Sequence, residues 1–218
     1  MTDTKKRFIT EHELIQDAFR LAVKIYQSDF QPNVVVGIWR GGSTVGIYVQ
    51  ECLQYLGIKT DHIAIRTSYQ GLPSYQSMID SQDGIKVHGL KYLLENLNRD
   101  DRLLIVDDAY SSGVSIQAVI DQLAAKTKRN MPEQIRIAAP WFKPGRVRTG
   151  RKPDFYLHET DCWLVFPYEM VGLSEEEIAQ YKPGLKSILD SVTLPSAASV
   201  SPAPPSSEPP SPEPSSGS

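Results

Sequence analysis

Two adjacent carboxylates, Asp107 and Asp108, stand between an aliphatic run and a short loop of small polar residues. The aliphatic run, Leu103–Val106, has the length and composition of a strand buried on both faces of a parallel sheet. In open α/β sheets ligands bind at the carboxyl edge, where the two carboxylates would lie. Carboxylates accept hydrogen bonds from sugar hydroxyls and attract hard cations such as Mg²⁺.

The loop that follows is rich in donors: it contains Ser111, Ser112, Gly113 and Ser115. It leads into a stretch from Ile116 to Leu123 whose apolar residues recur at helical spacing. Free backbone N–H groups and the positive end of a helix dipole at such a loop favour an anion. The motif therefore predicts a phosphorylated, polyhydroxylated ligand bound together with Mg²⁺.

A second loop of the same kind occurs earlier in the chain. The aliphatic run Val34–Ile38 predicts a strand, Trp39 and Arg40 end it, and Gly41 and Gly42 precede a helix predicted over residues 43–56. Glycines let the backbone approach a polyanion, and Arg40 can neutralise its charge. Because both loops follow parallel strands, they are expected to face one ligand from the same sheet edge. An ordinary strand-to-helix turn with a solvated arginine is the alternative for this segment.

The remaining patterns alternate between strand and helix. Strands are predicted over residues 60–67, 85–87 and 135–139, and helices over 10–26 and 90–97. The first of these helices begins at a capping box, Thr10 with Glu13. Alternation of this kind predicts an α/β fold with a mostly parallel central sheet flanked by helices.

The segment from Leu103 to Ser115 resembles the phosphoribosyl pyrophosphate (PRPP) motif of the type I phosphoribosyltransferases. Taken alone it would also fit a receiver-like domain or a solvated turn. The run Val34–Gly42 is similar to the pyrophosphate loop of the purine enzymes in this family. That resemblance implies a cis peptide bond between Trp39 and Arg40.

A third resemblance covers the region that would recognise the base. Lys143 with Pro144, and then Trp163, Leu164, Pro167, Tyr168 and Glu169, are similar to the base-binding hood of the bacterial xanthine-guanine and hypoxanthine enzymes. By this resemblance Lys143 donates to the purine 6-oxo group, Trp163 stacks on the ring, and the backbone around Leu164 reads the exocyclic edge. Without the pattern, Trp163 would fit a plain core position equally well.

The polar stretch from Ser68 to Gly84 is long for a loop in a compact domain, which is typical of a functional lid or of disorder. In the family this position carries a mobile loop that closes over the site, often with a Ser-Tyr pair. Ser68 and Tyr69 match that pair. Such a lid would keep PRPP away from water.

Together these resemblances imply a purine phosphoribosyltransferase, a pentosyltransferase of purine salvage that moves the 5-phosphoribosyl group of PRPP to a 6-oxopurine. Asp107 and Asp108 would hold the ribose hydroxyls and Mg²⁺, and Arg40 with Gly41 would stabilise the departing pyrophosphate. The 5′-phosphate would lie on the loop, at Ser111, Ser112, Gly113 and Ser115. The resemblance also implies a homo-oligomer, a dimer or tetramer.

One position departs from the family pattern. Where most 6-oxopurine enzymes place an aspartate beside the purine ring nitrogen, this chain has Ser111. A hydroxyl is too weak a base at neutral pH, and loss of a general base typically costs about 10² to 10⁴ in rate. Adenine and orotate enzymes of the same fold also lack this aspartate. A non-catalytic PRPP or nucleotide sensor, and a transferase with a non-purine acceptor, therefore stay open; no second domain copy supports a PRPP-forming synthetase.

Composition sets the outer limits of these hypotheses. The chain has 218 residues and a formal net charge of −3, which argues against a nucleic-acid partner held by bulk charge. Two distant cysteines, Cys52 and Cys162, suggest a reduced, cytoplasmic protein, and neither a signal peptide nor a membrane span is expected. We predict a phosphoribosyltransferase domain over residues 1–194, with the hood formed mainly by 140–172 and the N-terminal segment as a candidate addition to it. The Pro/Ser-rich tail, 195–218, is predicted to be disordered.

Overall fold

The computed structural model describes residues 6–68 and 85–191. The chain divides into two compact units, Met1–Val171 and Gly172–Ser218. This boundary lies earlier in the chain than the domain end at residue 194 that composition predicts. The domain end at residue 194 stays a prediction. The predicted disordered tail, 195–218, lies outside the described residues.

A central sheet of five strands organises the first unit. Its order is β4 (Lys86–His88), β3 (Asp61–Ser68), β2 (Val34–Trp39), β5 (Arg102–Val106) and β7 (Gln134–Ala138). β4 runs antiparallel to β3, and the other pairs of neighbours in this sheet are parallel. This arrangement confirms the predicted α/β fold with a mostly parallel sheet. The two aliphatic runs form neighbouring inner strands of it, β2 and β5.

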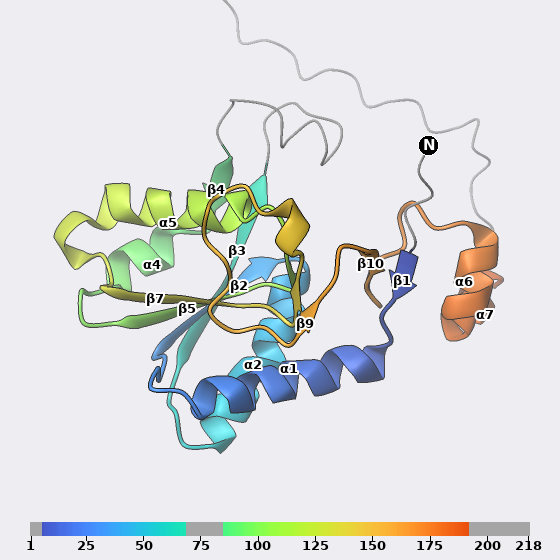
Figure 1. Ribbon diagram of the computed structural model, residues 1–218, viewed down its shortest axis with the longest axis horizontal. Coiled ribbons are helices and arrows are strands. Elements are labelled where there is room, and N and C mark those ends of the chain that lie inside the picture. The colour runs from blue at the N-terminus through green and yellow to red at the C-terminus, as the bar shows by residue number, and fades with distance from the viewer. Residues whose placement is uncertain (1–5, 69–84, 192–218) are drawn as a thin grey trace, which may run out of the picture. The chain divides into compact units, whose positions relative to one another are not determined.

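Helices cover both faces of this sheet (Figure 1). On one face lie α1 (Glu11–Tyr26) and α2 (Gly41–Tyr55), and on the other lie α4 (Lys91–Asn96) and α5 (Val114–Thr127). Side chains of a strand alternate between the two faces, so the strands contribute to two separate cores. Val35 and Leu104 pack with α1 and α2, whereas Val36 and Ile105 pack with α4 and α5.

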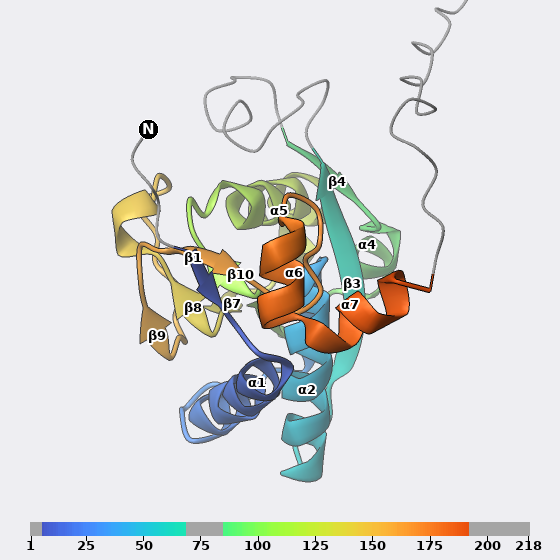
Figure 2. The ribbon, with the colours of Figure 1, turned by 90° about the vertical axis from the view of Figure 1, so that its right-hand side faces the viewer.

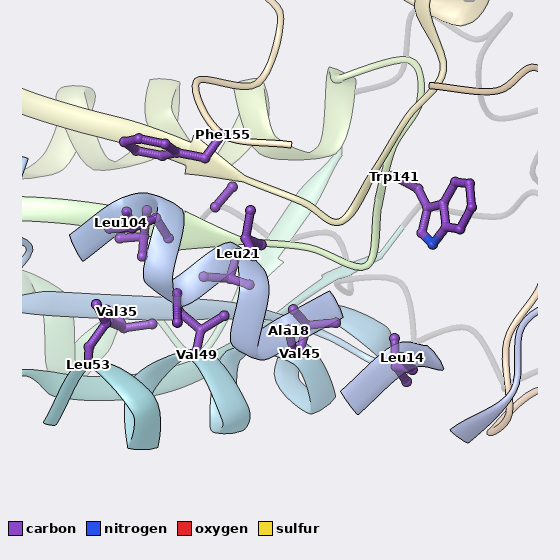
Figure 3. Packing of buried hydrophobic residues seen from close by; sticks show 14 of the residues in the cluster. Leu14, Ala18, Leu21, Val35, Val45, Val49, Leu53, Leu104, Trp141 and Phe155 are labelled. Carbon is purple, nitrogen blue, oxygen red and sulfur yellow. The ribbon is translucent and has the colours of Figure 1, made fainter. Parts of the chain in front are cut away.

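The core under α1 and α2 is formed by apolar side chains of these helices and of the central strands (Figure 3). Leu21 of α1 and Val49 and Leu53 of α2 are fully buried beside Leu104 of the central strand. The capping box expected at Thr10 is observed in part. The Thr10 hydroxyl accepts a hydrogen bond from the Glu13 amide (3.1 Å), and Gly57 follows α2 with φ +93°. In place of the expected reciprocal cap, the Glu13 carboxylate accepts a hydrogen bond from Arg7.

The connections of the sheet define the position of the site. From β2 the chain moves to β3 on one side, and from β5 it moves to β7 on the other. β2 and β5 are parallel neighbours, with Gly37 opposite Val106. The loops after these two strands therefore leave the same sheet edge and diverge from each other, which is the arrangement that creates a binding crevice in α/β proteins.

Two small sheets lie outside the central one. β1 (Lys6–Phe8) pairs in parallel with β10 (Trp163–Val165), so the N-terminal segment lies beside the segment that carries Trp163 (Figure 2). A three-stranded sheet contains β6 (Ala109–Tyr110), β8 (Trp141–Phe142) and β9 (His158–Glu159). Two 3₁₀ turns, Lys128–Asn130 and Pro144–Arg146, complete the described elements of this unit.

One strand expectation is shifted in the structure. The apolar residues 155–157 have the composition of a strand, but there Phe155 forms an isolated bridge with Ala138, and the strand β9 begins at His158. The Phe155 side chain is buried in the core, where its ring lies 6.3 Å from that of Phe30. Its backbone amide donates to the Ile137 carbonyl (3.0 Å).

The second unit contains two short helices, α6 (Glu175–Tyr181) and α7 (Pro183–Leu189). The helix α6 begins at a capping box, because the Ser174 hydroxyl accepts from the Glu177 amide and the Glu177 carboxylate accepts from the Ser174 amide. Among the described residues of the whole chain, no helix combines the length and the hydropathy that a membrane crossing requires.

The central strand gives a direct test of the fold. Leu104→Ala removes a fully buried side chain from the core, and such truncations cost about 2–5 kcal/mol because they leave a cavity. We expect urea denaturation to show a decrease of this size in the free energy of unfolding. The control Ile47→Ala changes a side chain that is 61% exposed on α2, and it should stay within about 0.5 kcal/mol of the wild type. Equal effects of the two substitutions would contradict the assigned core.

Candidate functional site

The loops after β2 and β5 are packed directly against each other. A Cβ atom added to Gly42 would lie 2.4 Å from the Val106 carbonyl oxygen and 2.8 Å from the Asp107 Cα atom. A Cβ atom added to Gly41 would lie 1.9 Å from Asp108 Oδ2. All three distances are shorter than real Cβ atoms show, so glycines at both positions allow the Arg40 loop to contact the acidic pair this closely. The two motifs that the sequence placed at one edge thus meet there.

Arg40 lies at the start of α2, and the peptide bond between Trp39 and Arg40 is cis. This confirms the cis bond that the family resemblance implied. Both side chains are exposed at the sheet edge, Trp39 by 58%. The Arg40 guanidinium is thus available to an anion that enters between the two loops.

The acidic pair is held by backbone hydrogen bonds. Asp107 Oδ1 accepts from the Asp108 amide (3.0 Å), and Asp108 Oδ1 accepts from the Ala109 amide (2.7 Å). Burial, and then the nearby charge of Asp108, raise the pKa of Asp107 well above its ordinary value. Ionisation of both carboxylates is therefore unfavourable in the free protein, and a bound cation would favour it.

The serine loop begins at Tyr110 and leads into α5. Gly113 is the residue before the helix and has φ +77°, a left-handed conformation that favours glycine. The buried Tyr110 hydroxyl donates to the Arg151 carbonyl (2.7 Å), and the Arg148 amide donates to the Ser112 carbonyl (3.0 Å). The basic segment 143–152 is thereby held along the predicted phosphate loop.

Among the predicted loop residues, Ser112 and Gly113 are buried, while Ser111 and Ser115 are partly exposed. Ser112 Oγ accepts a long hydrogen bond from the Val114 amide (3.4 Å). Ser111, which replaces the family's aspartate, directly follows Tyr110, and Tyr110 pairs with Phe142 of β8. The structure therefore brings Ser111 beside the strand that leads to Lys143.

Lys143 lies at the junction of the acidic pair and the predicted hood. Its amide donates to the Tyr110 carbonyl (2.9 Å). Burial lowers the pKa of the Lys143 ammonium, and the charge of Arg146 lowers it further, whereas the charges of Asp108 and Asp161 act in the opposite direction. The backbone bond to Tyr110, two residues after Asp108, places Lys143 beside the segment that carries the acidic pair.

Trp163 and Leu164 begin the β10 strand and have opposite environments. The Trp163 side chain is 58% exposed, whereas Leu164 is buried, with 5% exposed. The exposed ring rules out the alternative that Trp163 is a core residue; Trp141 of β8, at 1% exposure, has that role. The Trp163 segment approaches Lys143, because the Thr160 amide donates to the Phe142 carbonyl (2.9 Å) and the Gly145 amide to Asp161 Oδ1 (3.2 Å).

Tyr168 is a site residue to which the sequence analysis gave no role. Its hydroxyl donates a hydrogen bond to Asp108 Oδ2 and lies against the Cα atom of Gly41. The only signal in the sequence was the position of Tyr168 in the Pro-aromatic-acid pattern that ends the hood motif. That pattern does not indicate that the aromatic residue carries a hydroxyl partner for the acidic pair.

The predicted lid residues are only partly described. Ser68 ends β3, and its hydroxyl lies 2.6 Å from Nε2 of His88 on the neighbouring strand β4. Tyr69 and the rest of the predicted lid, residues 69–84, lie outside the described residues.

The donors at this edge suit Mg²⁺ better than a transition metal. Mg²⁺ binds through one or two carboxylates and completes its shell with water and substrate phosphates. Asp107 and Asp108 offer two such carboxylates. The described part of the chain contains no group of three or more His, Cys, Asp or Glu residues that could form an all-protein metal site. The residues present therefore fit a cation shared with a phosphorylated ligand.

Comparison with known proteins agrees with this geometry. The model of the phosphoribosyl transferase domain matches residues 7–171, and the chain therefore belongs to the phosphoribosyl transferase family. The resemblance to type I phosphoribosyltransferases noted in the sequence is thus confirmed. A search of curated proteins found no significant match.

Solved structures show the same fold. The purine phosphoribosyltransferase from Pyrococcus horikoshii Ot3 is 26% identical, has a TM-score of 0.55, and the match covers 78% of this chain and 98% of that one. The Helicobacter pylori xanthine-guanine-hypoxanthine phosphoribosyltransferase is 18% identical and has a TM-score of 0.56. That match covers 74% of this chain and 92% of the other. A hypothetical protein from Neisseria gonorrhoeae, solved with bound ppGpp, is 17% identical and has a TM-score of 0.63. That match covers 84% of this chain and 99% of the other.

The contact between the two loops can be tested with a single methyl group. Gly42→Ala should force the Arg40 loop away from the backbone of β5, and a misplacement of about 1 Å costs about 100-fold in turnover. Initial-rate assays of phosphoribosyl transfer measure this loss. Gly46→Ala, on the same helix, places its Cβ in ordinary contact at 3.7 Å and should keep full activity. Its melting temperature should rise, since alanine is favoured over glycine in helices by about 0.5–1 kcal/mol.

The raised pKa of Asp107 predicts a pH-dependent effect on stability. Above the ordinary carboxyl pKa the unfolded chain loses this proton more readily than the folded protein, so ionisation of Asp107 opposes folding. Asp107→Asn should therefore increase the free energy of unfolding at pH 7. The gain should decrease as the pH falls and disappear below the ordinary carboxyl pKa, where both states are protonated. Urea denaturation at a series of pH values measures it.

The exposed Asp100 provides the control for this experiment. Asp100→Asn should change the free energy of unfolding by no more than about 0.5 kcal/mol. An Asp107→Asn protein that is less stable than the wild type at pH 7 would contradict the conclusion that ionisation of Asp107 opposes folding.

Proposed function

We propose that this protein transfers the 5-phosphoribosyl group of PRPP to a 6-oxopurine, such as hypoxanthine, guanine or xanthine. The products are a nucleoside 5′-monophosphate and pyrophosphate, a reaction of purine salvage. The observation that carries the proposal is the meeting of three features at one sheet edge. These are the acidic pair, the Arg40 loop with its two close glycines, and Lys143, whose amide donates to the carbonyl of Tyr110, two residues after Asp108.

The PRPP end of the site follows from the loops. Asp107 and Asp108 would accept hydrogen bonds from the ribose hydroxyls. The amides and hydroxyls of the serine loop, at the start of the 14-residue helix α5, would bind the 5′-phosphate. Arg40 and the amide of Gly41 would stabilise the pyrophosphate as it leaves, which we expect to be the largest electrostatic contribution to the rate.

The base end uses the segments that surround Lys143. An ammonium donor favours a 6-oxo over a 6-amino group, because an oxo oxygen accepts a hydrogen bond whereas an amino group donates. The exposed Trp163 ring offers a face for a flat heterocycle, and the backbone at Leu164 would contact the exocyclic edge. The lowered pKa of Lys143 reflects partial desolvation of its ammonium, which strengthens a hydrogen bond to the base.

The chemical step is a substitution at the anomeric carbon. The bond from C1 to the pyrophosphate oxygen breaks and its electron pair leaves with the pyrophosphate, while a ring nitrogen of the base forms the new bond to C1 and loses its proton. A bound Mg²⁺, held by Asp107 and Asp108 directly or through water, supplies neutralisation of the pyrophosphate charge. Ser111 can bind phosphate or contact the ring, but it cannot accept the proton at neutral pH. In this proposal the proton leaves to water or to pyrophosphate.

A base panel tests the proposal. Product formation from PRPP is measured with hypoxanthine, guanine and xanthine, and with orotate and uracil as non-purine acceptors. We expect turnover with at least one 6-oxopurine and none with orotate or uracil. Asp107→Asn combined with Asp108→Asn should reduce turnover by about 10² or more, since both ribose contacts are lost. Unchanged turnover in this double variant would contradict the assigned site.

Other outcomes separate the alternatives. Turnover with orotate or uracil alone would identify a transferase with a non-purine acceptor. Calorimetric binding of PRPP without turnover of any base would identify a non-catalytic sensor, a role for which the serine at position 111 is suited. Each of these results would replace the proposed function.

A further inference from the structure

Tyr168 connects the segment of Trp163 and Leu164 with the acidic pair. Its hydroxyl donates to Asp108 Oδ2, while the Ala109 amide donates to Asp108 Oδ1 at 2.7 Å. Each oxygen of the Asp108 carboxylate therefore has one donor, and the two donors come from different segments. Two donors on opposite oxygens fix both the position and the plane of a carboxylate.

The Tyr168 hydroxyl is itself held by a rigid support. The Tyr168 ring stacks on Phe166 with a centroid distance of 5.6 Å and an interplanar angle of 5°. Phe166 is 4% exposed and belongs to the core under α1 and α2, and its amide donates to Glu169 Oε2 (2.9 Å). The position of the hydroxyl is thus set by the core of the domain.

The site also has space for this hydroxyl only because of a glycine. A Cβ atom on Gly41 would lie 2.0 Å from the Tyr168 hydroxyl oxygen and 1.9 Å from Asp108 Oδ2. The pyrophosphate loop, the ribose-binding carboxylate and Tyr168 consequently share one point of contact.

The protonation of Tyr168 suits a permanent donor. An ordinary tyrosine phenol has a pKa of about 10, well above neutral pH. The hydroxyl therefore stays protonated at neutral pH. A carboxylate oxygen has two lone pairs, so a bond from Tyr168 leaves the second one free to accept from a ligand.

We propose that Tyr168 is a positioning residue of phosphoribosyl transfer: it orients the Asp108 carboxylate so that the remaining lone pairs face the ribose hydroxyls. This inference rests on the proposed function, since it assigns Asp108 to the ribose. It adds a residue of the base-binding segment to the recognition of the sugar. Removal of the phenol oxygen should weaken contacts to the ribose hydroxyls specifically and leave contacts to the phosphate and the base intact.

The experiment removes the two partners independently. Calorimetry measures the binding of inosine 5′-monophosphate and of its 2′,3′-dideoxy analogue to the wild type and to Tyr168→Phe. The wild type should prefer the nucleotide with both hydroxyls. In Tyr168→Phe that preference should fall about tenfold, because a carboxylate held by a donor on one oxygen alone no longer keeps its plane toward the hydroxyls. The affinity for the dideoxy analogue should change by less than about twofold, which also demonstrates that the variant is folded.

Tyr92→Phe is the matched control. The Tyr92 hydroxyl also donates to an aspartate, Asp61 Oδ2, but Asp61 begins β3 at the opposite edge of the sheet. This variant should keep the wild-type preference for the ribose hydroxyls. It removes the same atom from the same kind of contact at a position that is remote from the site.

Three results would overturn the inference. Tyr168→Phe could keep the full preference for the hydroxyls, which leaves the proposed function intact but removes the role of Tyr168. It could lose affinity for both nucleotides equally, which indicates a general structural role. Finally, the wild type could bind neither nucleotide, in which case both the proposed function and this inference fail.

Discussion

The contact between the Arg40 loop and the acidic pair is the constraint on which the rest of the site depends. β2 and β5 are parallel neighbours in register, and the chain leaves them in opposite directions, so their loops face a common crevice. Two consecutive glycines then allow the loop backbone to approach Val106 and the carboxylates more closely than any side chain would permit. A loop that carries a cation is thereby fixed next to two anions.

This arrangement gives up stability in order to hold charge in place. Asp107 and Asp108 are adjacent and partly buried, and their repulsion is relieved in part by backbone amides and by Tyr168. A ligand that brings hydroxyl donors and a cation would relieve the rest of this repulsion. The site thus gains more from binding than a neutral crevice of the same shape would, because the repulsion already exists in the free protein.

Much of the framework could be predicted from local patterns. The aliphatic runs of β2 and β5, the glycine after α2 and the capping box at Ser174 each depend on neighbours within a few residues. The two-residue strands β6, β8 and β9 could not, since they exist only because distant segments meet. The same reason explains Tyr168: its partner, Asp108, is 60 positions away, and no local periodicity indicates a hydrogen bond of that range.

The pairing of β1 with β10 has a practical consequence for work with this protein. Lys6–Phe8 lie alongside Trp163–Val165, and Arg7 additionally covers the Trp141 ring at 4.3 Å and binds Glu13. The beginning of the chain is therefore a structural support of the segment that we assign to the base. A substitution or deletion within Lys6–Phe8 would therefore disturb the segment that carries Trp163.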